Sequence, residues 1–216
     1  MKRLNNKMHK KLSLIKVQRK LTNKHMLVFS PLEFMRTFEV TKSAANFFIN
    51  YHLKTGLFIK LRNGLYALKT RPPSELEIAN RLYGPSYVSL EYAMMFYSII
   101  PDTVYSVTSV NTKSSREFVI DNIRYAYSKI KKNAFKGYLR KPMDDNIVLI
   151  ADPEKAFVDY LYFVDLGQKV VYDRIDASKL SKNKLIGYAK LFKRKSLVKL
   201  VNKIYDQSRR SKTIIY

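Results

Sequence analysis

The pair Asn63-Gly64 lies between two short apolar runs and is the strongest local constraint in this sequence. Both residues tolerate positive φ angles, which the tightest β-hairpin turns require. We therefore predict paired strands at Leu57–Leu61 and Leu65–Leu68, joined through a tip that begins with Arg62.

Two helices are predicted just before this hairpin. Ser30 is a preferred N-cap residue, and Pro31 and Glu33 suit the first turn that follows it. This first helix is expected to end near Phe38. The sequence therefore places a short, well-capped helix directly upstream of a second one.

The second helix is predicted over Lys42–Lys54, after the N-cap residue Thr41 and before Gly56, where a left-handed residue is usual. Two helices, a tight turn and a basic-tipped hairpin are the parts of a winged helix-turn-helix, a compact DNA-binding unit. The predicted fold class is α+β. An N-terminal winged helix-turn-helix domain over residues 1–71 precedes a mixed α/β domain over residues 72–216 that ends in basic helices.

A helical wheel divides the second helix into two sides. The packed side is predicted to hold Ala44, Ala45, Phe48, Tyr51, His52 and Leu53. The opposite side holds Lys42, Ser43, Asn46, Phe47, Asn50 and Lys54. In a major groove, Asn pairs with adenine, Ser and Lys contact bases or phosphates, and Phe contacts a thymine methyl group. The alternative is an ordinary amphipathic helix with a solvated polar side.

The hairpin is expected to contact phosphates or the minor groove of the same duplex through Lys60, Arg62 and Asn63, with Lys69 nearby. The alternative is that these charges only keep an exposed sheet edge soluble.

The net charge of +24 is concentrated at the two ends of the chain. Residues 1–25 contain nine Lys or Arg and no acid, and residues 177–216 contain twelve against one acid. Such a distribution favours a surface that faces a polyanion over a solvated basic tail or a membrane-surface helix. The predicted secondary basic surface comprises Lys10, Lys11, Lys16, Arg19, Lys20, Lys190, Lys193, Arg194 and Lys195.

The composition excludes several protein classes. Without Cys there is neither a disulfide framework nor a Cys-based zinc site, which suits a reducing compartment. The apolar run Leu12–Ile15 is too short for a signal peptide, and no run approaches a bilayer span. A cytoplasmic protein without a membrane partner is expected.

The remaining N-terminal pattern predicts a helix over residues 4–21, with an apolar stripe of Leu4, Met8, Leu12, Ile15 and Leu21, and a short strand at Met26–Phe29. Arg71-Pro72-Pro73 is predicted as the domain boundary, because two prolines stiffen the exit from the hairpin.

The second domain is predicted to mix helices and strands. Helices are expected from Ser74 to about Leu82, over Leu90–Ile99 after an N-cap at Ser89, and after Asp152 with one apolar face. Two basic helices should follow, over Ser181–Lys193 and Ser196–Gln207. The strands are expected at Val104–Val110, Glu117–Ile120, Ile123–Tyr127, Gly137–Leu139 and Ile147–Ile150, with a turn at Asp121-Asn122.

No catalytic, cofactor or metal motif is found. His9, His25 and His52 lack the spacing of metal ligands, and Asp152 with Glu154 is interpreted as an ordinary helix start. The alternatives left open are a metal-dependent nuclease that uses Asp152 and Glu154, and an RNA-binding or ribosome-associated protein rich in Tyr and Phe.

Three segments resemble the AbiEi antitoxin family. They are RNGLYAL (Arg62–Leu68), PSYVSLEYAMMFYSIIP (Pro85–Pro101) and IADPEKAFVDYLYF (Ile150–Phe163). Their order and spacing behind a winged helix are similar to those of these regulators, which are encoded beside nucleotidyltransferase toxins in phage-defence operons. The resemblance extends from about Ser30 to Phe163.

The resemblance implies two activities. The N-terminal domain would bind inverted repeats in its own promoter and repress the operon, and the C-terminal domain would counter the toxin. These are type IV systems, in which toxin and antitoxin need not bind each other. The expected partners are therefore operator DNA and, functionally, a nucleotidyltransferase toxin.

Overall fold

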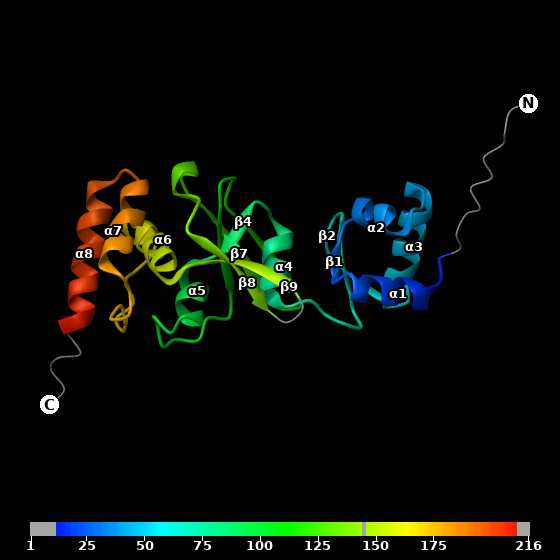
Figure 1. Ribbon diagram of the computed structural model, residues 1–216, viewed down its shortest axis with the longest axis horizontal. Coiled ribbons are helices and arrows are strands. Elements are labelled where there is room, and N and C mark those ends of the chain that lie inside the picture. The colour runs from blue at the N-terminus through cyan, green and yellow to red at the C-terminus, as the bar shows by residue number, and fades with distance from the viewer. Residues whose placement is uncertain (1–11, 144–145, 211–216) are drawn as a thin grey trace, which may run out of the picture. The chain divides into compact units, whose positions relative to one another are not determined.

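The computed structural model describes residues 12–143 and 146–210 of the chain. Over these residues the protein is a mixed α+β structure with eight α-helices and two sheets. The chain divides into two compact units, Met1–Ser74 and Glu75–Tyr216, coloured blue to cyan and cyan to red in Figure 1. This division falls three residues after the predicted domain boundary at residue 71.

The N-terminal unit packs three helices against one small sheet (Figure 1). Its elements are α1 (Leu14–Asn23), β1 (Val28–Phe29), α2 (Pro31–Phe38), α3 (Lys42–Lys54), β2 (Phe58–Arg62) and β3 (Leu65–Leu68). The strands are antiparallel in the order β1-β3-β2. Pairing of Val28 with Ala67 confirms the short strand predicted at Met26–Phe29.

The predicted starts of α2 and α3 are confirmed. The Ser30 hydroxyl accepts a hydrogen bond from Glu33 N at 3.3 Å, and the Glu33 carboxylate accepts one from Ser30 N at 2.7 Å. This capping box satisfies the backbone N–H groups that the first turn of α2 leaves free. The Thr41 hydroxyl caps α3 in the same way by accepting from Ala44 N.

A cluster of aromatic rings forms the core of the N-terminal unit. The Phe34 ring lies 4.5 Å from that of Phe38, 5.6 Å from Phe29 and 5.7 Å from Phe48. These four side chains come from β1, α2 and α3, so one cluster fixes the mutual positions of three elements.

The structure corrects the N-terminal prediction at the first helix and at the hairpin. Ile15, placed in the apolar stripe of the first helix, is 76% exposed, whereas Leu21 of the same stripe is buried, together with Val17, which was not assigned to it. Leu4 and Met8 lie outside the described residues. At the hairpin, Gly64 alone adopts a positive φ (72°) and Asn63 does not, since a β-bulge between Lys60 and Arg62 supplies the missing twist.

The C-terminal unit is built around a six-stranded mixed sheet with the order β6-β7-β5-β4-β9-β8. Its strands are β4 (Ser86–Val88), β5 (Val107–Asn111), β6 (Arg116–Ile120), β7 (Ile123–Lys129), β8 (Tyr138–Met143) and β9 (Asn146–Ala151). Its helices are α4 (Glu75–Leu82), α5 (Leu90–Phe96), α6 (Pro153–Asp165), α7 (Lys182–Leu191) and α8 (Lys195–Arg210), besides a short 3-10 turn, η1 (Lys132–Ala134).

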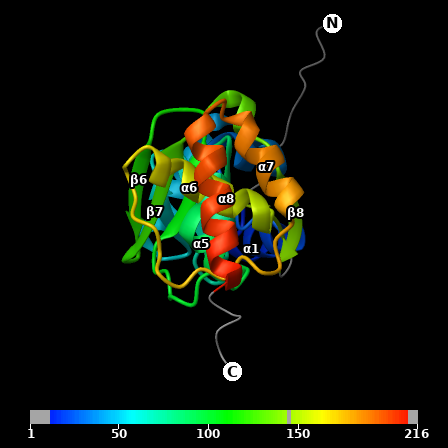
Figure 2. The same cartoon turned by 90° about the vertical axis from the view of Figure 1, so that its left-hand side faces the viewer.

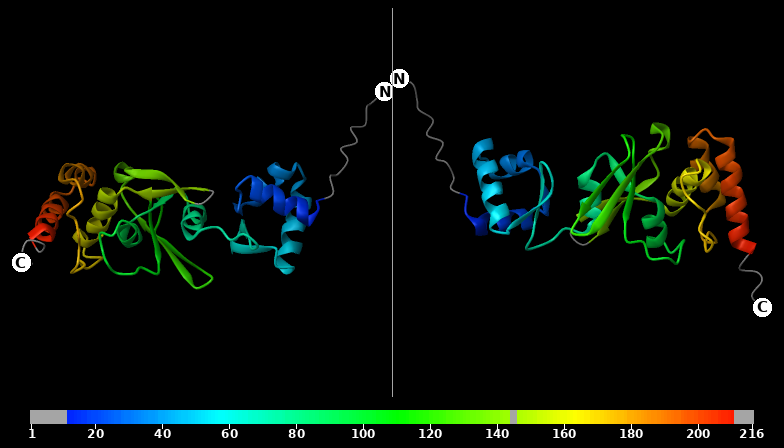
Figure 3. Two further views of the ribbon diagram at one scale, coloured as in Figure 1. Left: turned by 60° about the horizontal axis from the view of Figure 1, so that its bottom comes forward. Right: turned by 180° about the vertical axis from the view of Figure 1, so that it is seen from behind.

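Helices cover both faces of this sheet. The Tyr127 hydroxyl donates to the Ala79 carbonyl of α4 at 2.6 Å on one face, and the Tyr87 hydroxyl donates to Asp159 of α6 at 3.0 Å on the other. Figure 3 shows α4 on the first face and α5 and α6 on the second. Helices α7 and α8 pack side by side over α6 (Figure 2).

In the C-terminal unit, some predicted helices, strands and turns are confirmed, others differ from the structure in where they end, and one strand was not predicted. Asp121 and Asn122 both adopt positive φ, as expected of a two-residue turn between β6 and β7. Helix α5 ends at Phe96 instead of Ile99, because Ser98 turns to a φ of 55°. Strand β4 was not predicted, since three buried residues carry no alternation.

Two further differences concern edges and burial. Strand β8 continues past Leu139 to Met143 and through Pro142, which an edge strand tolerates because half of its N–H groups need no partner. Helix α6 was predicted with one apolar face but is buried on all sides from Glu154 to Phe163.

Among the described helices, none has the length and apolar content that crossing a bilayer demands.

Candidate functional site

Helix α3 is held in the N-terminal unit by one side only. Ala45, Phe48, Ile49 and His52 are its buried side chains, and they face the aromatic core. Ile49 was not assigned to the packed side by the helical wheel, although only 1% of it is exposed. This anchoring turns the remaining side chains of α3 to solvent.

The exposed side of α3 carries the residues predicted to contact DNA. Lys42, Ser43, Phe47, Asn50 and Lys54 are exposed, and Asn46 is half-buried. Neither the Asn46 nor the Asn50 amide bonds to another side chain within residues 12–143 and 146–210. An outward amide with free donors and acceptors is what base recognition requires.

Two aromatic rings lie on this same exposed surface. Phe47 is 74% exposed and Tyr51 is 55% exposed, and their rings are nearly parallel, with centroids 6.4 Å apart and an interplanar angle of 17°. The prediction that Tyr51 packs inward was therefore wrong. The neighbouring His52 is buried instead, and its ring lies edge-on to that of Tyr51 with centroids 5.0 Å apart.

The β2–β3 hairpin exposes its basic residues. Lys60, Arg62, Asn63 and Lys69 are all exposed, and Arg62 Nη1 donates to the Asn63 carbonyl at 2.9 Å. That contact orients the guanidinium along the tip of the hairpin. The bulge beside Arg62 fixes the direction of the tip.

The N-terminal unit carries an excess of positive charge. Residues 12–74 contain eleven Lys or Arg and only two acids, Glu33 and Glu39. The Glu33 carboxylate is occupied by the capping box, and burial lowers the pKa of His52, so this histidine contributes no charge near neutral pH. An excess of cationic side chains therefore characterises the unit that carries α3 and the hairpin.

The predicted secondary basic surface is heterogeneous. In α1, Lys16 and Arg19 are exposed, whereas Lys20 donates to the Thr37 carbonyl at 2.6 Å and lies over the Phe38 ring. Lys10 and Lys11 lie outside the described residues. Lys20 thus fastens α1 to α2 in addition to any role at the surface.

The C-terminal members of that set also differ. Lys190, Lys193 and Lys195 are exposed near the junction of α7 and α8. Arg194 donates through Nε to Asp165 at 2.5 Å and is half-buried. Its charge is therefore compensated by a structural ion pair that joins this junction to the end of α6.

The C-terminal unit buries a polar cluster that sequence reasoning missed. Lys155 Nζ forms an ion pair with Asp159, one turn along α6, and both side chains are fully buried. The other Asp159 oxygen accepts from the Tyr87 and Ser89 hydroxyls at 3.0 and 2.9 Å. The i, i+4 spacing of Lys and Asp was the available signal.

Burial dominates the electrostatics of this pair. Desolvation raises the pKa of Asp159 and lowers that of Lys155, and the attraction between the two opposes both shifts. Ser89 was predicted as a side-chain N-cap for α5, but its hydroxyl is directed to Asp159 instead. With every polar atom engaged and none exposed, the cluster is built to fix α6 on the sheet.

The two acids of the nuclease hypothesis are engaged in the structure. Asp152 caps α6 by accepting from Lys155 N at 2.7 Å, and its second oxygen accepts from the Tyr188 hydroxyl at 2.5 Å. Glu154 accepts from Ser181 N at 3.0 Å and faces Lys184. Within the described residues, no group of three or more His, Cys, Asp or Glu could hold a metal ion.

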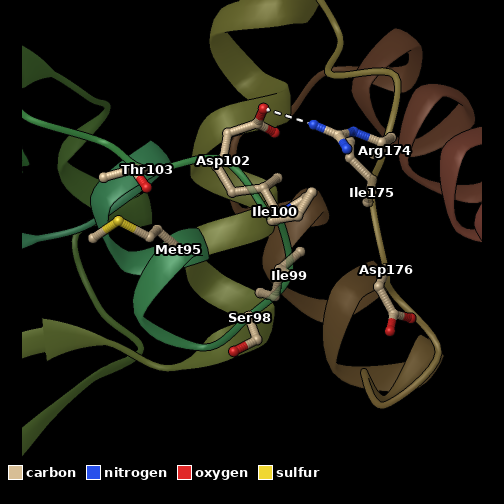
Figure 4. Close-up of a pocket in the computed structure, with 10 residues that line it drawn as sticks. Met95, Ser98, Ile99, Ile100, Asp102, Thr103, Arg174, Ile175 and Asp176 are labelled. Atoms are coloured by element: carbon tan, nitrogen blue, oxygen red, sulfur yellow. Dashed lines mark hydrogen bonds and ion pairs between the residues drawn. The ribbon is translucent and has the colours of Figure 1, made fainter.

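A shallow hollow lies where the loop after α5 meets residues 174–176 (Figure 4). Arg174 and Asp102 form an ion pair of 3.3 Å across its rim, and apolar side chains such as Met95 and Ile99 line it. Both members of this ion pair are solvent-accessible, and Asp176 is a further charged residue that lines the hollow.

The geometry thus singles out α3 and the β2–β3 hairpin as the candidate interface. Comparison of the sequence with protein-family models and with curated proteins finds no match.

Proposed function

We propose that the N-terminal unit is a winged helix-turn-helix that binds duplex DNA through α3 and the β2–β3 hairpin. The order of its elements supports this: a capped helix, a short connection at residues 39–41, a second helix and then a hairpin. In such units the second helix enters the major groove and the hairpin lies along the backbone.

One observation carries the proposal. The only side of α3 that the core leaves uncovered displays amide, hydroxyl and ammonium groups together, in a unit almost without acids. Asn46 and Asn50 would pair with base edges, while Lys42, Lys54, Lys60 and Arg62 would hold phosphates.

The resemblance to AbiEi antitoxins extends the proposal to a biological role. The protein would repress its own promoter at inverted repeats, and its C-terminal unit would counter a nucleotidyltransferase toxin. The protein would act without a catalytic centre or cofactor of its own, in the cytoplasm.

Binding is tested with the full chain. Sites are selected from a random duplex library and from the region upstream of the gene, and affinities are measured by fluorescence anisotropy. Asn50→Ala should weaken binding to the selected site by about 1–3 kcal/mol while leaving non-specific binding unchanged.

Asn23→Ala is the matched control, because Asn23 is an exposed asparagine at the end of α1 in the same unit. Equal affinity of the Asn50 and Asn23 variants for the selected site would contradict base recognition by α3. Absence of any duplex binding would remove the proposal entirely.

The antitoxin role has a separate test. If a nucleotidyltransferase reading frame adjoins this gene, its expression should arrest growth, and coexpression of the present protein should restore it. Residues 75–216 should suffice for rescue if the two roles are divided between the units. Failure of the full chain to rescue would refute the antitoxin role and leave DNA binding unaffected.

A further inference from the structure

The rings of Phe47 and Tyr51 lie together on the exposed side of α3. Hydrogen bonds and ion pairs to bases and phosphates do not explain why these two rings are exposed. Tyr105, 85% exposed, pairs with no other ring among the described residues, whereas these two rings lie nearly parallel with centroids 6.4 Å apart. At Phe96 and Tyr97, where a second ring also accompanies an exposed one, the Lys141 ammonium lies over both rings. A preorganised, uncovered aromatic pair marks an interaction site.

The surroundings of the pair indicate the chemistry of its partner. Lys42, Asn50 and Lys54 are exposed on the same helix, and neither acid of the unit belongs to it. A second copy of this chain would bring like charges together, which disfavours a homodimer through this face. A polyanion that also offers apolar groups satisfies both the cations and the rings.

Duplex DNA offers such groups in its major groove. The C5-methyl of thymine is the one apolar substituent on the base edges there, and a Phe side chain is a suitable contact for it. Positions 47 and 51 are one helical turn apart, roughly 6 Å along the axis. With about 3.4 Å between successive base pairs, that separation corresponds to roughly two base pairs.

We propose that Phe47 and Tyr51 contact the C5-methyl groups of two thymines about two base pairs apart, and so determine the thymine content of the binding site. This inference rests on the proposed DNA binding and specifies what part of the sequence α3 recognises. The tyrosine hydroxyl is not needed for such a contact, so Phe at position 51 should serve equally well.

The test uses selected duplexes in which single thymines are replaced by deoxyuridine, which removes only the methyl group. Wild-type protein should lose about fourfold in affinity at each contacted thymine. Phe47→Ala and Tyr51→Ala should each weaken binding to the unmodified duplex roughly tenfold. Each should also become insensitive to deoxyuridine at its own position, an effect that a purely structural role of the ring would not produce.

Two control variants accompany the test. Leu32→Ala truncates another exposed apolar side chain, 49% exposed and on α2, and should change neither affinity nor methyl dependence. Tyr51→Phe should behave as wild type. The circular dichroism melting curve of each variant establishes that folding is retained.

The outcomes separate this inference from the proposed function. Sequence-specific binding that tolerates deoxyuridine everywhere, with neutral Phe47 and Tyr51 variants, overturns the inference and leaves DNA binding standing. Preference for single-stranded RNA, or a change of oligomeric state in the ring variants, also overturns it. Failure to bind any duplex overturns both.

Discussion

Helices α3 and α6 are each thirteen residues long and each begins at a side-chain N-cap, yet they place their polar residues in opposite environments. In α3, Lys42, Ser43 and Asn50 face solvent. In α6, Lys155 and Asp159 are fully buried and bonded to each other. The comparison shows that residue type alone does not mark a functional site.

The neighbours of the two helices explain the difference. Helix α3 packs against α2 and β2 on one side, whereas α6 is enclosed by α5, β9, α7 and α8. A buried polar group must find an internal partner, and once it has one it is no longer available to a ligand. The exposed polar groups of α3 have no such obligation, so they remain accessible to a ligand.

The largest expected effect tests the structural role of the α6 cluster. Asp159→Ala leaves the Lys155 ammonium buried without its partner and should lower the free energy of unfolding by about 3–5 kcal/mol, measured by urea denaturation. Asp206→Ala, which breaks the exposed Lys182–Asp206 pair, should lower it by only about 0–1 kcal/mol. Similar losses in the two variants would contradict the contrast between buried and exposed polar groups.

The N-cap residues of α3 and α6, Thr41 and Asp152, extend the same comparison, with smaller expected losses of stability. Thr41→Ala removes one exposed capping bond and should reduce stability by about 1 kcal/mol. Asp152→Ala also leaves the Tyr188 hydroxyl unpaired and should reduce it by about 2–4 kcal/mol. Thermal or urea unfolding distinguishes the two, and a larger loss for Thr41 would be the contrary result.

Replacement of an exposed lysine of the β2–β3 hairpin should change DNA binding and have little effect on stability. If Lys60 holds one phosphate, Lys60→Ala should weaken affinity for every duplex sequence and reduce the slope of log K against log salt by about 0.9. Lys129→Ala, an exposed lysine of the C-terminal unit, is the control and should leave the slope unchanged. A slope that is equally steep in both variants would show that the hairpin does not contact the backbone.

The smallest expected effect concerns His52, the one titratable group buried on α3. Burial lowers its pKa from 6.5, so the folded chain binds fewer protons than the unfolded chain just below that pH. Its contribution to stability is complete above about pH 6.5 and is lost as the pH falls below that value.

Replacement of His52 by Gln should remove this component and flatten the dependence of unfolding free energy on pH between 7 and 5. The same replacement at the exposed His25 is the control. An unchanged pH dependence in the His52 variant would mean that the ring is already solvated in the folded chain.

Much of the N-terminal unit was predictable because its signals are local. The Ser30–Glu33 capping box, the Thr41 cap and the Asn63-Gly64 tip each depend on residues within four positions of one another. For the same reason the bounds of α2 and α3 agree with the prediction, and the exposed side of α3 was anticipated except for Tyr51.

The tertiary structure alone decided what depends on distant partners. Asp159 lies in the core because Tyr87 and Ser89, about seventy residues earlier, present hydroxyls to it. Strand β4 exists because β5 and β9 pair with it, and α6 is enclosed by helices that follow it in the chain. Local sequence determined where α2 and α3 begin and end and where the hairpin turns, since capping and φ preferences act within a few residues. Which polar side chains are buried and which face solvent was decided by long-range packing, because burial is a property of the assembled neighbours.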